Sequence, residues 1–307
     1  MTSSISSLEA AVSRFAQNCN ATSSFLLKLF WENNDGRFLA SINDHISNSG
    51  TAANIAVLDS SFNPPHACHK AYLELITRRP LVPLSRVLDH QTSETDNSGG
   101  DSPLRVDGKL ILLSSANCDK KPSGASLVQR LGMMEILGKE LVVDGDGSSS
   151  VATGLCNAPR FVDKAIVLYR FFSRIPFAED RVPNGPTTKV VLYFMMGWDT
   201  LIRLFDPKYY DAFPEDLEPF FSYGGRIVYA RRGGFDDSDV SDFLAKRIPM
   251  EFQKYIFEIE LPRELAAISS TRAREEAGVL GRSKEYEAMV PKSIRDFISS
   301  QQIYKKV

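Results

Sequence analysis

The sequence predicts an α/β fold, a doubly wound parallel sheet with helices on both faces and an N-terminal extension. Short apolar runs bounded by turn-forming residues alternate with segments that repeat apolar residues at the helical period. Strands that are apolar throughout and separated by helices are typical of parallel sheets buried on both faces. With 307 residues, 43% of them hydrophobic, the chain is long enough to bury such a sheet.

The individual elements follow from the same patterns. Continuous apolar runs predict strands at residues 54–62, 109–116, 140–144, 188–196, 225–231 and 255–261. Helical periodicity predicts helices at residues 67–78, 124–138, 160–174, 199–205, 237–247, 271–277 and 291–300. This alternation places the carboxyl ends of the parallel strands along one edge of the sheet, where α/β proteins bind ligands.

The chain divides into an extension and a main domain. Residues 1–50 precede the first predicted strand and carry an apolar pattern of their own, so we expect an appended helical hairpin or cap. Residues 51–307 are expected to form the α/β domain. Two segments rich in Ser, Gly, Asp and Asn, residues 89–108 and 144–150, are expected to be exposed loops inserted into that domain.

Composition excludes several classes of protein. A net charge of -2 and the absence of a long basic run argue against nucleic acid as a partner. The four cysteines lie dozens of residues apart, which fits neither a disulfide framework nor a zinc site and favours a reducing compartment. No apolar run approaches the length of a membrane span, so we expect no membrane partner and a cytoplasmic or nuclear location. A homo-oligomer is compatible with the sequence.

Two of the four histidines, His66 and His69, lie three residues apart where the first strand gives way to a helix. A helix N-terminus offers unpaired N–H groups to a phosphate. Imidazoles at this spacing share one helical face and can donate hydrogen bonds to phosphate oxygens, more strongly when protonated. The alternatives are ordinary core or surface histidines, or a zinc pair, although no HExxH pattern supports zinc.

A second motif, Ile268-Ser-Ser-Thr-Arg-Ala-Arg274, follows the last predicted strand and opens a helix. Its hydroxyls, backbone N–H groups and Arg274 side chain are suited to phosphate oxygens. The alternative for Ser269, Ser270 and Thr271 is plain helix capping, which is the commonest use of such residues.

Together the two motifs resemble the nucleotidyltransferase superfamily with HxGH and ISSTxxR signatures, and most closely the nicotinamide mononucleotide adenylyltransferases. The family opening GSFNPxTxxH is similar to Ser60–His69 here, although Ser60 and Cys68 stand where the family has glycines. The similarity extends along most of residues 54–305. It implies a Rossmann-like sheet.

The resemblance also implies the residues of the site. The catalytic group is His66, His69 and Arg274. The residues implied to bind ATP are Ser60, Phe62, Gly197, Asp199, Ile268, Ser269, Ser270 and Thr271. Those implied to bind the mononucleotide are Ser61, Lys120, Lys121, Phe161, Asp163, Trp198 and Tyr210. Phe161 and Tyr210 would stack on the pyridine ring. A core phenylalanine, a solvated loop lysine and an N-capping Asp199 are the ordinary alternatives.

The implied reaction joins ATP and nicotinamide mononucleotide to give NAD and pyrophosphate. The mononucleotide phosphate attacks the α-phosphorus of ATP in line, and Mg²⁺ is carried by the ATP phosphates rather than by protein ligands. Two alternatives remain open at this stage. The acceptor could be that of another adenylyl- or cytidylyltransferase of the superfamily, or the site could bind nucleotide without turnover in a regulatory protein.

Overall fold

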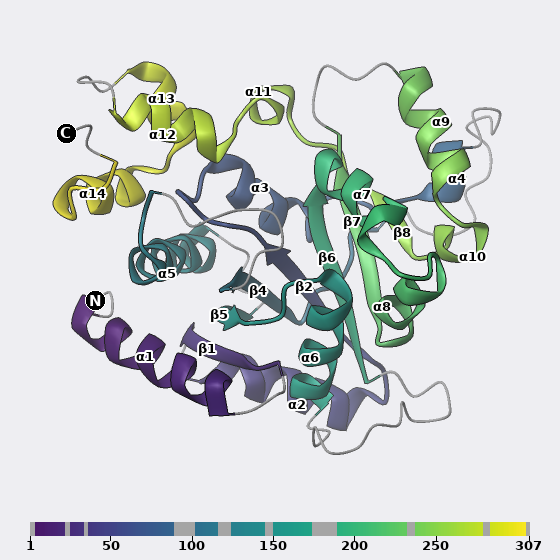
Figure 1. Ribbon diagram of the computed structural model, residues 1–307, viewed down its shortest axis with the longest axis horizontal. Helices are drawn as coiled ribbons and strands as arrows, with labels where there is room; N and C mark the ends of the chain where they lie inside the picture. The colour runs from purple at the N-terminus through teal and green to yellow at the C-terminus, as the bar shows by residue number, and fades with distance from the viewer. Residues whose placement is uncertain are drawn as a thin grey trace.

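The computed structural model describes residues 4–21, 25–33, 36–88, 102–115, 124–144, 150–173, 189–231, 237–278 and 283–304 (Figure 1). The described residues form an eight-stranded sheet in the order β1-β5-β4-β2-β6-β7-β8-β3. The strands are β1 (Leu27–Glu32), β2 (Ala53–Asp59), β3 (Val82–Pro83), β4 (Gly108–Ser114), β5 (Ser150–Cys156), β6 (Val190–Gly197), β7 (Gly225–Ala230) and β8 (Ile256–Glu258). The predicted α/β fold is confirmed.

The middle of the sheet is parallel and doubly wound. Strands β5, β4, β2, β6, β7 and β8 run parallel to one another, while β1 and β3 pair antiparallel at the two ends. After β2 the chain first passes through the short strand β3 at the far edge of the sheet. It then adds β4 and β5 on one side of β2, and returns to add β6 on the other side. The carboxyl ends of β2 and β6 therefore flank the switch point, where ligands bind in such sheets.

Helices cover both faces of the sheet and close two apolar cores. The helices on one face are α2 (Arg37–Ser49), α4 (Leu84–Leu88), α6 (Phe161–Ser173), α7 (Trp198–Leu204), α8 (Glu218–Ser222), α9 (Asp237–Arg247) and α10 (Met250–Gln253). Those on the other face are α1 (Ile5–Ala21), α3 (Ala67–Leu75), α5 (Leu127–Asp144), α11 (Arg263–Ala266), α12 (Ser270–Gly278), α13 (Lys284–Met289) and α14 (Lys292–Ser300).

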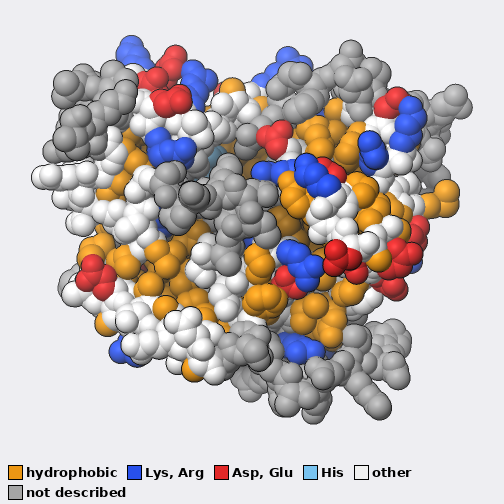
Figure 2. Space-filling view, in the orientation of Figure 1, with side chains coloured by type: hydrophobic (Ala, Val, Ile, Leu, Met, Phe, Trp, Pro, Cys, Tyr) orange, Lys and Arg blue, Asp and Glu red, His pale blue; other side chains and the backbone are white. Residues whose placement is uncertain are grey.

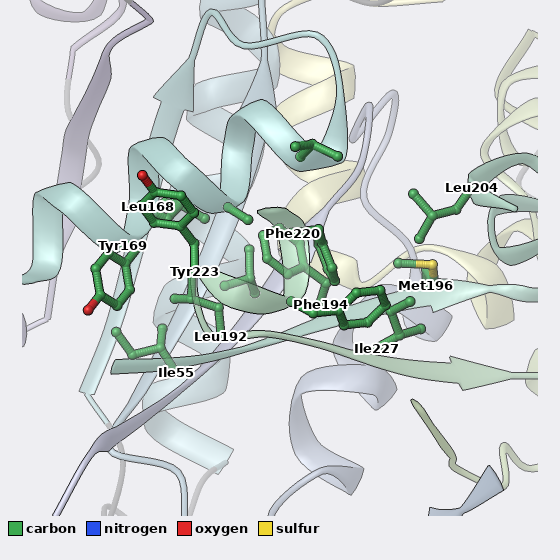
Figure 3. Close-up of a cluster of buried hydrophobic side chains, with 14 of the residues drawn as sticks. Ile55, Leu168, Tyr169, Leu192, Phe194, Met196, Leu204, Phe220, Tyr223 and Ile227 are labelled. Atoms are coloured by element: carbon green, nitrogen blue, oxygen red, sulfur yellow. The ribbon is translucent and has the colours of Figure 1, made fainter. Parts of the chain in front are cut away.

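The core on the α6 side is rich in aromatic rings (Figure 3). Phe194 of β6 packs 5.1 Å from Phe220 and 6.0 Å from Phe161, between ring centroids. Rings of this size bury a large apolar area and prefer such tilted or edge-to-face contacts. This packing fixes the start of α6 and the end of β6 against each other, beside the switch point.

The surface shows no segregation of charge on the side that Figure 2 presents. Basic and acidic side chains lie interspersed there, in keeping with the net charge of -2. Among the described residues, no helix is both long and apolar enough to cross a membrane.

One predicted strand is wrong. Residues 140–144 form the last turns of α5, and the strand of this region is β5, which begins at Ser150. A short apolar run cannot be distinguished by periodicity from a buried part of a helix. In the structure Leu141 is buried while Val143 is 81% exposed, which is the one-sided burial of a helix.

The helical expectation for residues 1–50 is wrong at residues 27–32. These residues form β1, which pairs antiparallel with β5 from Leu27 opposite Cys156 onward. The flanking helices also bury their apolar faces against the main sheet, α1 through Phe15 and α2 through Phe38. The inserted loops expected at 89–108 and 144–150 fall largely outside the described residues.

Candidate active site

The loop between β2 and α3 lies at the switch point of the sheet. Strands β2 and β6 are neighbours, with Leu58 opposite Met195; Ser60 directly follows the carboxyl end of β2, and Gly197 is the last residue of β6. Ser61 is exposed, and so is Asp199 in the first turn of α7. These predicted ATP and mononucleotide ligands therefore share one edge of the sheet.

The backbone of this loop is held in an unusual conformation. Phe62 has a φ of 44° although its side chain is completely buried. A bulky residue with positive φ persists only where surrounding contacts determine it. The next residue, Asn63, is 4% exposed, and its Oδ1 accepts hydrogen bonds from Ala125 N at 3.1 Å and from the Tyr304 hydroxyl at 2.6 Å.

The two histidines form a stacked pair at the start of α3. Their ring centroids are 3.7 Å apart with an angle of 20° between the planes, and both side chains are buried. The backbone N–H of His66 donates to Nδ1 of His69 at 3.1 Å, so Nδ1 acts as an acceptor. The ring proton of His69 is therefore on Nε2, which lies 3.0 Å from the Ser60 hydroxyl. In this arrangement His69 is a neutral donor that points to the loop.

Helix α12, which carries the second motif, is docked directly on the histidine loop. Arg274 donates from Nη1 to the carbonyl of Asn63 at 2.7 Å, and Ser270 donates to the carbonyl of Pro64 at 3.0 Å. The two motifs are more than 200 positions apart in sequence. Their contact places the guanidinium beside the N-terminus of α3.

The remaining residues of the second motif have mixed environments. Thr271 is exposed and accepts from Nη2 of Arg274 at 3.2 Å, which orients the guanidinium. Ser269 accepts from the backbone N–H of Arg272 at 3.2 Å, which is the capping role considered as its alternative. Ile268 is 6% exposed and packs in the core, so only its backbone can face a ligand.

The predicted mononucleotide side lies at the start of α6. Phe161 is half-buried, and the ammonium of Lys164 lies 4.9 Å from its ring centroid. Asp163 is buried and accepts two hydrogen bonds from Arg160, at 2.9 and 3.0 Å. Its charge is thus already paired by a forked guanidinium.

Tyr210 reaches the same region from the segment after α7. Its ring packs against the same aromatic core as Phe161, it lies near enough to Arg160 to feel the guanidinium charge, and its hydroxyl donates to the carbonyl of Leu204 at 2.6 Å. Burial raises the pKa of Tyr210. The hydroxyl therefore stays protonated, and the residue offers a ring edge or face rather than a charge.

Two groups that sequence reasoning did not place in the site are found there. Asp59, the last residue of β2, accepts from the Lys164 ammonium at 2.5 Å, and both side chains are less than 10% exposed. Arg130 of α5 donates to the Ala125 carbonyl at 2.8 Å and lies near enough to Tyr304 to interact with it electrostatically. Burial lowers the pKa of Arg130, and the positive charge of nearby Arg274 acts in the same direction. In the sequence, the only indication of Asp59 and Arg130 was that each is a charged residue within or just after an apolar run.

Some predicted residues are not brought to the site. Trp198 is 2% exposed, and its ring packs 5.7 Å from Tyr229 and 5.3 Å from Phe243. It is a core residue of α7, so its expected contact with the mononucleotide does not fit this arrangement. Lys120 and Lys121 lie outside the described residues. Within the described ranges, no group of three or more His, Cys, Asp or Glu side chains could hold a metal ion.

The sheet is doubly wound, and two phosphate-type motifs are joined at its switch point, an arrangement suited to binding a nucleotide. A Schizosaccharomyces pombe protein named "Putative nicotinamide mononucleotide adenylyltransferase" is 29% identical over 262 residues, which are 82% of this chain and 86% of the relative. This similarity confirms the family resemblance of the motifs.

Two solved structures are also similar to the chain. They are the Plasmodium falciparum nicotinic acid mononucleotide adenylyltransferase complexed with APC and the same enzyme complexed with NaAD. Their sequence identities are 14% and 15%, and their TM-scores are 0.48 and 0.44. Each covers 82% of this chain and 97% of its own. No protein-family model matches the chain.

Proposed function

We propose that the protein is a nicotinamide-nucleotide adenylyltransferase, which converts ATP and nicotinamide mononucleotide into NAD and pyrophosphate. The observation that carries this proposal is the joining of the two motifs, by which Arg274 and the stacked histidines come to one loop at the switch point. The name of the fission yeast relative supports the choice of acceptor.

In the proposed reaction, an oxygen of the mononucleotide phosphate attacks the α-phosphorus of ATP. A new P–O bond forms while the bond from the α-phosphorus to the bridging oxygen breaks, and pyrophosphate leaves with that electron pair. No protein base is needed, because a phosphate monoester is largely ionised near neutral pH. ATP enters with Mg²⁺, which offsets negative charge on its phosphates.

The residues of this chain supply position and positive potential. His69 donates from Nε2, which now contacts the Ser60 hydroxyl at 3.0 Å and can turn to a phosphate oxygen instead. The N-terminal end of α3, which begins beside these histidines, adds positive potential from the helix dipole. Arg274 is held by Thr271 and by the Asn63 carbonyl, so its remaining N–H groups can bind the outer phosphates.

On the acceptor side, Phe161 and Tyr210 offer ring surface to the pyridine, which is cationic in the mononucleotide. The pairs Arg160 with Asp163 and Lys164 with Asp59 each bring one positive and one negative charge, so this side has no net charge from these four residues. The cationic pyridine ring is therefore stabilised by stacking on the aromatic rings, and not by an unpaired carboxylate.

The test is to incubate the pure protein with MgATP and a panel of acceptors, and to measure pyrophosphate and dinucleotide. We expect NAD from nicotinamide mononucleotide. His69→Ala should lower turnover by about 10²–10³, since one donor aimed at transition-state charge typically contributes this much. His45→Ala is the matched control, because His45 lies on α2 and contacts Thr51 and Asp107 instead.

Three results would contradict the proposal. ATP binding without pyrophosphate release would indicate a regulatory protein. Pyrophosphate release with a different acceptor would return the assignment to the wider superfamily. Equal turnover of His69→Ala and His45→Ala would remove the histidine loop from the reaction.

A further inference from the structure

Asn63 is the point at which four segments of the chain meet. Its Oδ1 accepts from the N–H of Ala125, before α5, and from the hydroxyl of Tyr304, after α14. Its backbone carbonyl accepts from Arg274 of α12. Asn63 itself lies in the loop between β2 and the histidine helix, and is 4% exposed. The position of the Arg274 guanidinium therefore depends on how firmly the Asn63 peptide is held.

Tyr304 is fitted closely to this asparagine. Its hydroxyl makes the shortest of the three bonds, at 2.6 Å, against 2.7 Å for Arg274 and 3.1 Å for Ala125. Burial raises the pKa of Tyr304, so the hydroxyl keeps its proton and acts as the donor. The residue has a φ of 64°, a conformation that a bulky side chain adopts only where its contacts determine it.

Gly124 completes the fit. It has a φ of +77°, and a Cβ there would lie 2.9 Å from Asn63 Oδ1 and 3.0 Å from Tyr304 Cε1. The Asn63 side chain and the Tyr304 ring therefore both pack closely against Gly124, where no side chain would fit. This close packing limits the orientations that the Asn63 amide can adopt.

We propose that Tyr304, near the C-terminal end of the chain, is a positioning residue for ATP. Through its bond to the Asn63 side chain it fixes the Asn63 peptide, and through that peptide it fixes the guanidinium of Arg274 and the loop before His66. It does not touch the substrate. The inference rests on the proposed function, in which Arg274 binds the outer phosphates of ATP.

The variant Tyr304→Phe tests this inference, because it removes the hydroxyl and keeps the ring. Tyr286→Phe is its matched control. Tyr286, on α13, is buried, and its hydroxyl has no hydrogen-bond partner within the described residues. Tyr304 is half-buried, so both variants lose one hydroxyl that is shielded from solvent on the same face of the sheet, and only Tyr304→Phe loses a bond to Asn63.

We expect Tyr304→Phe to weaken MgATP binding about three- to tenfold, the range of one net hydrogen bond, with the KM of the acceptor and the melting temperature close to those of Tyr286→Phe. Binding of MgATP is measured by calorimetry, which does not require turnover. A purely structural role would lower the melting temperature and the active fraction, while the affinity of the folded protein stayed unchanged.

The decisive measurement is the combination with Arg274→Ala. If Tyr304 acts through Arg274, the Tyr304→Phe change adds less than twofold to the loss of affinity already caused by Arg274→Ala. Equal affinity of Tyr304→Phe and Tyr286→Phe, or fully additive effects with Arg274→Ala, would overturn the inference. A wild-type protein that binds MgATP but forms no dinucleotide would instead overturn the proposed function, and the affinities would still decide the role of Tyr304.

Discussion

The buried ion pair between Lys164 and Asp59 allows a sharp prediction about stability. The variant Lys164→Met keeps the length and most of the volume of the side chain but leaves the Asp59 carboxylate without its partner. The two side chains are 6% and 9% exposed, and the ammonium lies 2.5 Å from the carboxylate oxygen. A carboxylate at this depth cannot recover much hydration when the partner is lost.

Removal of one partner from a buried pair typically costs about 3–5 kcal/mol, because an uncompensated charge remains inside the protein. A chain of this size loses about 2 °C of melting temperature per kcal/mol, so we expect Lys164→Met to melt about 6–10 °C lower. The double variant with Asp59→Asn contains neither charge, and should regain most of the lost stability.

The exposed pair Lys292 with Asp296 provides the control. It has a similar separation, 2.7 Å, but its side chains are 80% and 64% exposed. Lys292→Met should therefore change the free energy of unfolding by less than about 0.5 kcal/mol. Thermal melts and urea unfolding of all four proteins test the reasoning. It fails if Lys164→Met is no less stable than Lys292→Met, or if the double variant is less stable than Lys164→Met.

Three further predictions concern the site and its surroundings. Arg274→Ala should raise the KM for ATP at least tenfold and leave the KM of the acceptor unchanged; an unchanged ATP response with a lower melting temperature would favour simple capping of α12. Arg160 neutralises Asp163, so Asp163→Asn should change the ratio of kcat/KM between nicotinamide and nicotinate mononucleotide only slightly. Arg160→Gln leaves the carboxylate unpaired and should change this ratio more, against the acidic substrate. A larger effect of Asp163→Asn than of Arg160→Gln would contradict the pairing. Burial raises the pKa of the Cys156 thiol to about 11, above its value in the unfolded chain. The stability that this group contributes, roughly 2–3 kcal/mol, is therefore fully present below about pH 8.5 and is lost as the pH rises through 11. The urea midpoints at pH 8 and pH 11 should differ less in Cys156→Ala than in the wild type.

The sequence by itself determined the class of fold and the edge of the sheet that carries the candidate site. Apolar runs identified β2, β4, β6 and β7, because strands buried on both faces are apolar throughout. The order of strand, loop and helix around His66 and His69 then placed the histidines at a helix N-terminus, as the structure has them. These conclusions depend on neighbours in the sequence, so local patterns were sufficient.

Local patterns were insufficient where an element is defined by its partner. Residues 140–144 and 27–32 are both short apolar runs, yet one ends a helix and the other is an edge strand that exists because β5 lies beside it. From the sequence, Trp198 was expected to contact the mononucleotide because it directly follows Gly197. In the structure its ring packs in the core against Tyr229 and Phe243.

Only the tertiary structure decided which charges and hydroxyls meet. Asp59 and Lys164 are 105 positions apart, Asn63 and Arg274 are 211 apart, and Asn63 and Tyr304 are 241 apart. Each of these bonds depends on how the strands are ordered and how α12 and the last residues return to the sheet. Periodicity of 2 or 3.6 residues carries no information about such distant partners, because it reports only which face of one element is buried.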